Sequence, residues 1–249
     1  MSKLDGEHYD VVIIGAGMSG LAAGIRLARY DKRTLILERH TAPGGLNSFY
    51  KQRGFRYDVG LHAMTNYVPP GTKKTPLVKL LRQLRIPREA FDMAPQNGSR
   101  ILFDHRELFF DNDPCTLESQ IAEHFPTQID AYRKLVDAIR DYDDTALNYQ
   151  PGQSARDFLK AYLSDPLLQD MLLLPLLYYG SATENDMELA QFIIMFKSIY
   201  LEGFARPYDG VRTIIQALTK TYKQVGGERR MGMGIRAVLH DETKVRQLR

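Results

Sequence analysis

The 249-residue sequence has no tryptophan, a single cysteine and almost no excess of charge of either sign. Because Cys115 stands alone, an internal disulfide and a cysteine-rich metal site are both excluded. Lysine and arginine total 33 against 30 aspartates and glutamates, so the net charge of +3 does not indicate a nucleic-acid partner. With 44% hydrophobic and 25% charged residues, the composition is that of a globular chain that can bury a core.

Long apolar runs are also missing. Residues 1–10 are polar and carry both signs of charge, without the apolar stretch of a secretory signal. The densest apolar run, Met171–Tyr179, is interrupted by Pro175 and is too short to cross a bilayer as a helix. We therefore expect a cytoplasmic protein without a membrane span.

The first forty residues carry the strongest pattern. The β-branched run Val11–Ile14 predicts a strand buried on both faces of a parallel sheet. Gly15–Gly20, a G-x-G-x-x-G segment, follows directly, and Leu21–Arg29 has the composition of a helix. Thr34–Glu38 predicts a second strand that ends in an acid. This order predicts a βαβ unit of the Rossmann type.

Each motif residue has a physical task in dinucleotide binding. Gly15 permits the tight turn, Gly17 leaves room for a pyrophosphate, and Gly20 allows the helix to pack closely on the strand. The carboxylate of Glu38 can accept hydrogen bonds from a ribose diol, and it disfavours the 2′-phosphate of NADP, an objection that Arg39 could soften. The alternative, a glycine-rich turn in a purely structural unit, leaves Glu38 without a role.

A paired-glycine segment, Pro43–Ser48, and the segment Phe55–His62 follow. With these, Tyr9–His62 resembles the N-terminal FAD-binding region of amine oxidase superfamily flavoproteins. The resemblance is closest to the branch of phytoene desaturases, carotenoid isomerases and retinol saturases. It implies that the βαβ unit holds the ADP part of FAD and that Gly44-Gly45 lies against the pyrophosphate and flavin. It also implies that Asp58–His62 runs close to the isoalloxazine.

The resemblance implies a set of cofactor contacts but neither a metal site nor an assigned catalytic residue. In this family an arginine often stands beside the paired glycines, where this chain has Leu46. His62 is the histidine nearest the expected flavin and the candidate for tuning it or relaying protons, with a structural hydrogen-bonding role as the alternative. The implied FAD contacts are Gly15, Gly17, Ser19, Gly20, Glu38, Arg39, Gly44, Gly45, Leu46, Gly60, His62 and Ile235.

The resemblance also implies a discontinuous fold. We expect an α/β protein with a glutathione reductase-like, Rossmann-type FAD domain in residues 1–70, an inserted α+β substrate region in 71–207, and a return to the FAD domain in 208–249. A hairpin (Arg100–Phe103 with Glu107–Phe110) is predicted in the insertion, and a helix at Arg212–Gln224 in the return. Because family members are longer, we expect the C-terminal part of the fold to be missing, so that the chain is a fragment, a truncated reading frame, or one half of a split protein whose partner is the C-terminal half.

The function implied is that of an FAD-dependent oxidoreductase that transfers hydride between flavin and an apolar, polyene or isoprenoid small molecule. Two alternatives remain: an amine or porphyrinogen oxidase of the same superfamily, and a prenyl-binding protein like the GDP-dissociation inhibitors, which lack FAD and have a degraded glycine pattern. Several aromatic residues are candidates for lining an apolar tunnel, with a helix core as the alternative; they are Tyr178, Tyr179, Phe192, Phe196 and Tyr200.

One further segment predicts a peripheral membrane contact. After Pro76, an apolar stripe of four leucines (Leu77, Leu80, Leu81 and Leu84) lies opposite Lys79, Arg82 and Arg85 on a predicted helix. A basic amphipathic helix can lie on an anionic membrane. The alternative is a surface helix with a solvated charged face.

Overall fold

The computed structural model describes residues 7–60, 63–65, 67, 69–73, 75–103, 105–142, 152–242 and 245–248. The chain forms two compact units, which we call the first unit and the second unit. The first unit contains residues 1–62, 76–94 and 206–249, and the second contains 63–75 and 95–205.

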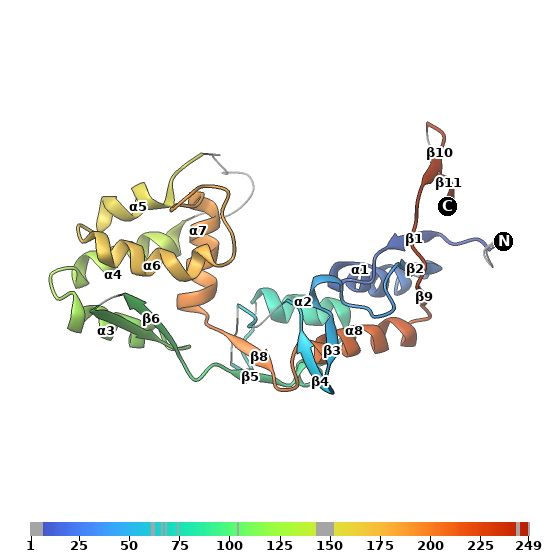
Figure 1. Cartoon of the computed structure of the whole chain (residues 1–249), viewed down its shortest axis with the longest axis horizontal. Helices are drawn as coiled ribbons and strands as arrows, with labels where there is room; N and C mark the ends of the chain where they lie inside the picture. Colours follow the sequence, from blue (N-terminus) through green and yellow to red (C-terminus); the bar gives the residue numbers. More distant parts are fainter. Residues whose placement is uncertain are drawn as a thin grey trace. The chain divides into compact units, whose positions relative to one another are not determined.

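The first unit is built on a parallel sheet of three strands (Figure 1). Strand β1 (Val11–Ile14) pairs with β2 (Thr34–Glu38), and β2 pairs with β9 (Glu228–Met231), so that β2 is central. Helix α1 (Met18–Ala28) connects β1 to β2, and α8 (Arg212–Gln224) precedes β9. The predicted βαβ unit and the predicted helix at 212–224 are both confirmed.

The two predicted strands differ in burial. Four residues of β2, Thr34 to Leu37, are at most 2% exposed, as expected for a central strand. The prediction that β1 is buried on both faces is wrong at Ile14, which is 58% exposed. The reason is its position, since β1 is the outer strand in the described sheet.

Tyr222 of α8 joins the helices to the sheet. Its hydroxyl hydrogen-bonds to Thr34 Oγ1 at 2.9 Å and donates to the carbonyl oxygens of Thr34 and Glu228. A Cβ atom at Gly24 of α1 would lie 2.7 Å from the Tyr222 ring, and one at Gly227 would lie 2.0 Å from it. The two glycines therefore allow the ring to fit between α1 and the start of β9.

The structure divides the chain differently from the expected boundaries 1–70, 71–207 and 208–249. Helix α2 (Pro76–Leu84), expected in the insertion, belongs to the first unit because it packs on α1. It buries Leu77, Leu81 and Leu84, and Arg29 of α1 donates from Nη2 to the Leu84 carbonyl oxygen at 3.1 Å. Leu80, predicted in the same stripe, is instead 47% exposed.

Short elements complete the first unit. Two antiparallel hairpins are formed by β3 (Phe49–Gln52) with β4 (Phe55–Asp58) and by β10 (Val238–His240) with β11 (Val245–Leu248). The remaining elements of this unit are η1 (Gly45–Asn47) and η2 (Arg88–Phe91).

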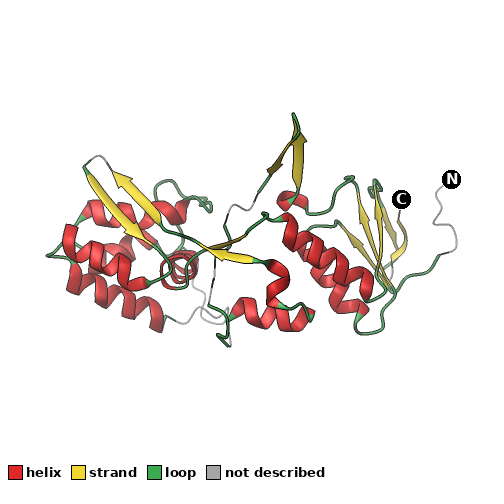
Figure 2. Ribbon diagram, turned by 90° about the horizontal axis from the view of Figure 1, so that it is seen from below, coloured by secondary structure: helices red, strands yellow, loops and turns green. Residues whose placement is uncertain are grey.

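The second unit is a group of helices with one hairpin (Figure 2). The predicted hairpin is confirmed, with Ile101 paired to Leu108, and its second strand begins one residue earlier than predicted, at Arg106, which pairs with Phe103. Its buried face and the helices share one core, which contains Leu172 and Phe192. The elements are β6 (Ser99–Phe103), β7 (Arg106–Phe110), α3 (Pro114–His124), α4 (Ile129–Asp141), α5 (Ala155–Tyr162), α6 (Pro166–Leu177), α7 (Leu189–Phe196) and η4 (Lys197–Leu201).

Strands β5 (Met93–Pro95) and β8 (Ala205–Pro207) form a separate two-stranded sheet. Among the helices that the structure describes, none combines the length and the apolar character needed to cross a membrane.

Candidate dinucleotide-binding site

Two glycine loops meet at the end of β1. The Gly44 N–H donates to the Ala16 carbonyl oxygen at 2.8 Å, and Gly44 forms a parallel bridge with Gly17. Gly44 and Gly45 have φ values of +123° and +59°, a region that favours glycine. A Cβ atom at Gly45 would lie 3.5 Å from Gly17 Cα. The structure thus brings the two predicted glycine motifs together in one cradle.

The three glycines of the first motif have different surroundings. Gly15 has a φ of +107° and continues the ladder by donating its N–H to the Leu37 carbonyl oxygen. A Cβ atom at Gly20 would lie 2.2 Å from the Gly15 carbonyl oxygen, so Gly20 is required for the close packing of helix on strand. A Cβ atom at Gly17 would meet no atom within 4 Å. Gly17 therefore opens space on the cradle.

Helix α1 begins at this cradle. Its N-cap, Gly17, makes no side-chain capping bond, and its first turn contains no acid. Ser19, a predicted contact, lies exposed in that turn. The first-turn N–H groups and the helix dipole favour a negative group here, such as a phosphate.

Glu38 lies beside the cradle at the end of β2. Its carboxylate accepts hydrogen bonds from the Ala16 N–H at 2.7 Å and from the His40 N–H at 2.8 Å. Burial acts to raise the pKa of Glu38, but the hydrogen bonds from His40 and Ala16 outweigh it, so that the pKa is lowered. Each carboxylate oxygen can accept a further hydrogen bond. The side chain is thus ionised, fixed and still able to accept from a ribose.

The return segment after β9 lies alongside the end of β2. The Met233 N–H donates to the Glu38 carbonyl oxygen at 2.8 Å, and the Gly232 N–H donates to the His40 carbonyl oxygen at 3.0 Å. A Cβ atom at Gly234 would lie 3.3 Å from Arg39 Cγ. Ile235, a predicted FAD contact, follows directly, so the segment that carries it adjoins Arg39 and Glu38.

The predicted flavin-side segment packs on the paired-glycine loop. The Val59 N–H donates to the Ser48 carbonyl oxygen at 3.0 Å, and a Cβ atom at Gly60 would lie 2.2 Å from the Leu46 carbonyl oxygen. The Leu46 side chain is 83% exposed. His62 lies outside the described residues, and its role stays a prediction.

An ion-pair network around Asp58 was not predicted. The Asp58 side chain is only 6% exposed and accepts from Arg212 at 2.8 Å and from Arg206 at 3.0 Å. Arg212 also donates to the Asp209 carbonyl oxygen at 2.8 Å. The network ties the flavin-side segment to the start of α8. Both segments stood out in the sequence, but nothing local indicates that residues 154 positions apart are paired.

The tunnel candidates in the second unit divide into two groups. Phe192, Phe196 and Tyr200 are fully or almost fully buried and contact one another, and Tyr200 donates its hydroxyl to the Leu172 carbonyl oxygen at 3.0 Å. These three residues therefore belong to the helix core, which was the alternative to the tunnel lining. Tyr178 and Tyr179 are 84% and 45% exposed.

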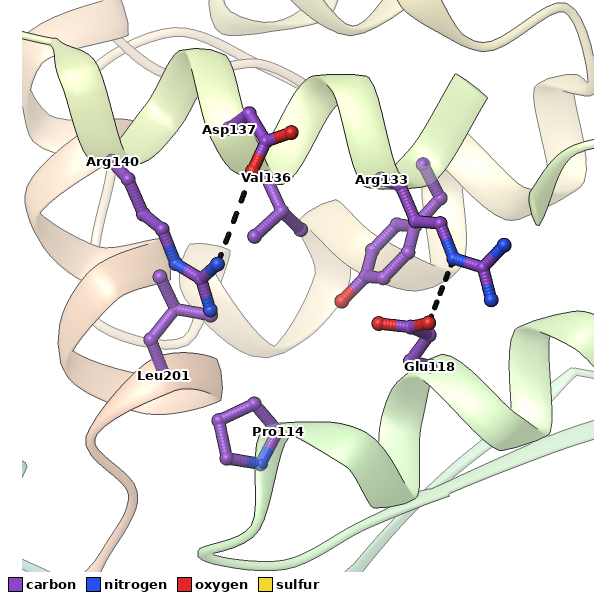
Figure 3. A pocket seen from close by; sticks show the side chains of 8 residues that line it. Pro114, Glu118, Arg133, Val136, Asp137, Arg140 and Leu201 are labelled. Atoms are coloured by element: carbon purple, nitrogen blue, oxygen red, sulfur yellow. Dashed lines mark hydrogen bonds and ion pairs between the residues drawn. The ribbon is translucent and has the colours of Figure 1, made fainter. Parts of the chain in front are cut away.

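The second unit also has a cavity of about 70 Å³ (Figure 3). Its charges are balanced, because Glu118 pairs with Arg133 at 2.8 Å and Asp137 lies 3.9 Å from Arg140. Ligand pockets for drug-sized molecules are commonly about 300–1,000 Å³, so this cavity is too small for an elongated polyene. Among the described residues, no group of His, Cys, Asp and Glu side chains is gathered as a metal site.

The fold and the glycine cradle define a Rossmann-like dinucleotide-binding domain. The family described as "NAD(P)-binding Rossmann-like domain" matches residues 13–84. More particular relatives confirm the resemblance seen in the motifs. The chain is 26% identical over 240 residues to a phytoene desaturase (lycopene-forming) of Pantoea ananas. The match covers 87% of this chain and 47% of that protein.

Two other relatives match shorter stretches. Prolycopene isomerase 2, chloroplastic, of an Oncidium hybrid cultivar is 28% identical over 136 residues, which are 52% of this chain and 22% of that protein. All-trans-retinol 13,14-reductase of Danio rerio is 39% identical over 66 residues, which are 25% of this chain and 11% of that protein. The chain spans about half the length of the phytoene desaturases that it matches.

Solved structures confirm the predicted fold class. An oxidoreductase from Methanosarcina mazei has a TM-score of 0.70 at 19% identity, covering 95% of this chain and 54% of that one. A putrescine oxidase has a TM-score of 0.59 at 18% identity, covering 94% and 53%. The Rab GDI of Plasmodium falciparum also has a TM-score of 0.59, at 15% identity, covering 98% and 62%. Because enzymes and a GDI share this fold, the fold alone does not identify the function, which has to be argued from the residues of the site.

Proposed function

We propose that this chain binds FAD and provides the FAD-binding part of an oxidoreductase that transfers hydride between flavin and an apolar, polyene-type substrate. The observation that carries the proposal is the cradle of Gly15, Gly17, Gly44 and Gly45 beside the fixed carboxylate of Glu38.

The cradle fits the charged middle of a dinucleotide. The open space at Gly17 and the free first-turn N–H groups of α1 suit a pyrophosphate. Glu38 would accept hydrogen bonds from the adenosine ribose, and the segment of Arg39 and Ile235 would border the adenine. Gly60 and the paired glycines would lie toward the flavin. When bound, FAD supplies the hydride chemistry, while the protein orients the reactants and excludes water.

The charge of Glu38 distinguishes among the dinucleotides. Its pKa is lowered, so the carboxylate is negative at neutral pH and repels the 2′-phosphate of NADP. The paired-glycine segment and the relatives named above favour FAD over NAD. A GDP-dissociation inhibitor-like role without cofactor would leave the open space at Gly17 and the positive φ values of Gly44 and Gly45 without a purpose.

The substrate class rests on the relatives. Phytoene, prolycopene and retinol, which appear in their names, are all apolar polyenes. The superfamily alternative, an amine oxidase, is favoured by structural neighbours that share the fold at low identity, among them a putrescine oxidase at 18% and a cyclohexylamine oxidase at 15%.

The test is a binding titration of the purified chain with FAD, ADP, NAD⁺ and NADP⁺, followed by calorimetry and by flavin absorbance after gel filtration. We expect binding of FAD and ADP but not of NADP⁺. Gly17→Leu should abolish this binding. Ala23→Leu adds similar bulk at an exposed position of α1 away from the cradle and should leave it unchanged. A folded wild-type chain that binds neither FAD nor ADP, or that prefers NADP⁺, would overturn the proposal.

A further inference from the structure

The three α-helices that the structure describes in the first unit carry positive charges but no carboxylates. Helix α1 contacts both α2 and α8. The cations of these three helices are Arg26, Lys79, Arg82, Lys220 and Lys223, together with Arg212, whose charge is neutralised by Asp58. By contrast, helices α3, α4, α5 and α6 of the second unit each carry at least one carboxylate. Although the total charge is nearly neutral, α1, α2 and α8 therefore form a basic surface on the first unit.

The cations of α2 are not used within the chain. Lys79 and Arg82 are exposed, opposite the buried Leu77, Leu81 and Leu84. Arg85 is exposed directly after the helix ends. Within the part of the chain that the structure describes, none of these three side chains forms an ion pair or hydrogen bond. In the second unit, the exposed Arg133 and Lys160 do have carboxylate partners.

An apolar side chain lies among these cations. Leu80, which follows Lys79 in α2, is 47% exposed. The packing of α2 on α1 decides how such a surface can meet a membrane. Because its leucine face is buried in the protein, α2 cannot insert that face into lipid. Any contact must be electrostatic, with Leu80 as a small apolar addition.

We propose that the outward face of α2, formed by Lys79, Leu80, Arg82 and Arg85, docks on a bilayer that contains anionic phospholipid. Lys220 and Lys223 of α8, which are also exposed and unpaired among the described residues, add to the positive potential of the same helical group. This inference goes beyond the proposed function, because it does not depend on whether FAD is bound.

The experiment is sedimentation of the purified chain with two kinds of vesicle, pure phosphatidylcholine and phosphatidylcholine with phosphatidylglycerol. We expect binding to the anionic vesicles only, and its loss as salt is raised, because screening weakens surface electrostatics. The variant Lys79→Glu/Arg82→Glu should lower the partition coefficient at least about tenfold, since each cation near the surface contributes to binding.

A matched control separates a docking face from general charge. Lys134→Glu/Lys160→Glu makes the same change in net charge on exposed positions of the second unit and should leave vesicle binding unchanged. Leu80→Ser should weaken binding several-fold at constant charge. The proposal is overturned if the wild-type chain does not bind anionic vesicles. It is also overturned if Lys79→Glu/Arg82→Glu and Lys134→Glu/Lys160→Glu reduce binding equally. Circular dichroism of each variant shows that it is folded.

Discussion

Gly17 and Gly20 are three positions apart in one motif, but we expect substitution by alanine to destabilise the chain much more at Gly20 than at Gly17. Gly20→Ala places a methyl group 2.2 Å from a backbone oxygen, and α1 must move. Overpacking of this kind typically costs about 1–3 kcal/mol of the free energy of unfolding. Gly17→Ala meets no atom and has an ordinary φ of −72°, so it should cost less than about 1 kcal/mol.

Affinity for the dinucleotide should separate these two variants. Gly17→Ala should weaken FAD binding at least about tenfold, because the methyl group takes the space that a pyrophosphate would use. Urea unfolding and calorimetric titration of both variants measure the two effects. Equal losses of stability would show that Gly17 is a packing residue and not part of a cradle.

The ionisation of Glu38 makes the free energy of unfolding depend on pH. Its pKa is lower in the folded chain, so its contribution is present above the pKa of the unfolded chain and is lost as pH falls through the folded value. Glu38→Gln cannot ionise, and its amide replaces one acceptor with a donor facing an N–H. We expect it to lower the melting temperature at pH 7 and to approach the wild-type chain at acid pH. A difference that is constant between pH 7 and pH 3 would contradict this assignment.

At the scale of elements, the Asp58 network predicts unequal roles for its two arginines. Arg212 is 19% exposed beside the buried carboxylate, whereas Arg206 is 50% exposed. Arg212→Ala leaves the buried Asp58 with only an exposed partner, and loss of a buried partner costs about 3 kcal/mol or more. Arg206→Ala removes only the half-exposed partner and leaves Arg212 on the carboxylate, so it should cost less than about 1 kcal/mol. Chemical denaturation of the two variants measures both values, and similar losses would show that Arg212 stabilises Asp58 no more than Arg206 does.

The elements that were predictable from sequence are those whose signals are local. The first βαβ unit follows from β-branched runs and glycine spacing, and the hairpin of β6 and β7 follows from its polar turn. The two glycine loops could be named as one site only through the resemblance, since nothing in either loop specifies the bond between Gly44 and Ala16.

Other features depend on tertiary packing that no local pattern specifies. The leucine stripe of α2 predicts that one face is buried but not which surface covers it. The sequence therefore does not indicate that this helix belongs to the first unit and not to the insertion. The same apolar periodicity is expected of a tunnel wall and of a core. Only the structure shows that Phe192, Phe196 and Tyr200 fill space against one another.

At the scale of the whole molecule, the chain has two cores but one dinucleotide cradle. Every described residue of the cradle belongs to the first unit, and Leu172 is fully buried in the core of the second. Leu172→Ala should therefore destabilise the second unit by about 2–5 kcal/mol, as expected for a cavity in a well-packed core. The affinity for FAD, measured well below the melting temperature, should not change.

The matched variant is Ile25→Ala, which opens a similar cavity under α1 in the core of the first unit, where Ile25 is also fully buried. It should lower both the stability of the first unit and the affinity for FAD, because α1 carries the N–H groups that face the phosphates. Scanning calorimetry with and without FAD distinguishes the two variants: bound ligand raises the melting temperature of the unit that holds it. If FAD protected Leu172→Ala and Ile25→Ala alike against a single shared transition, the two units would unfold as one. The cradle would then depend on the whole chain and not on the first unit alone.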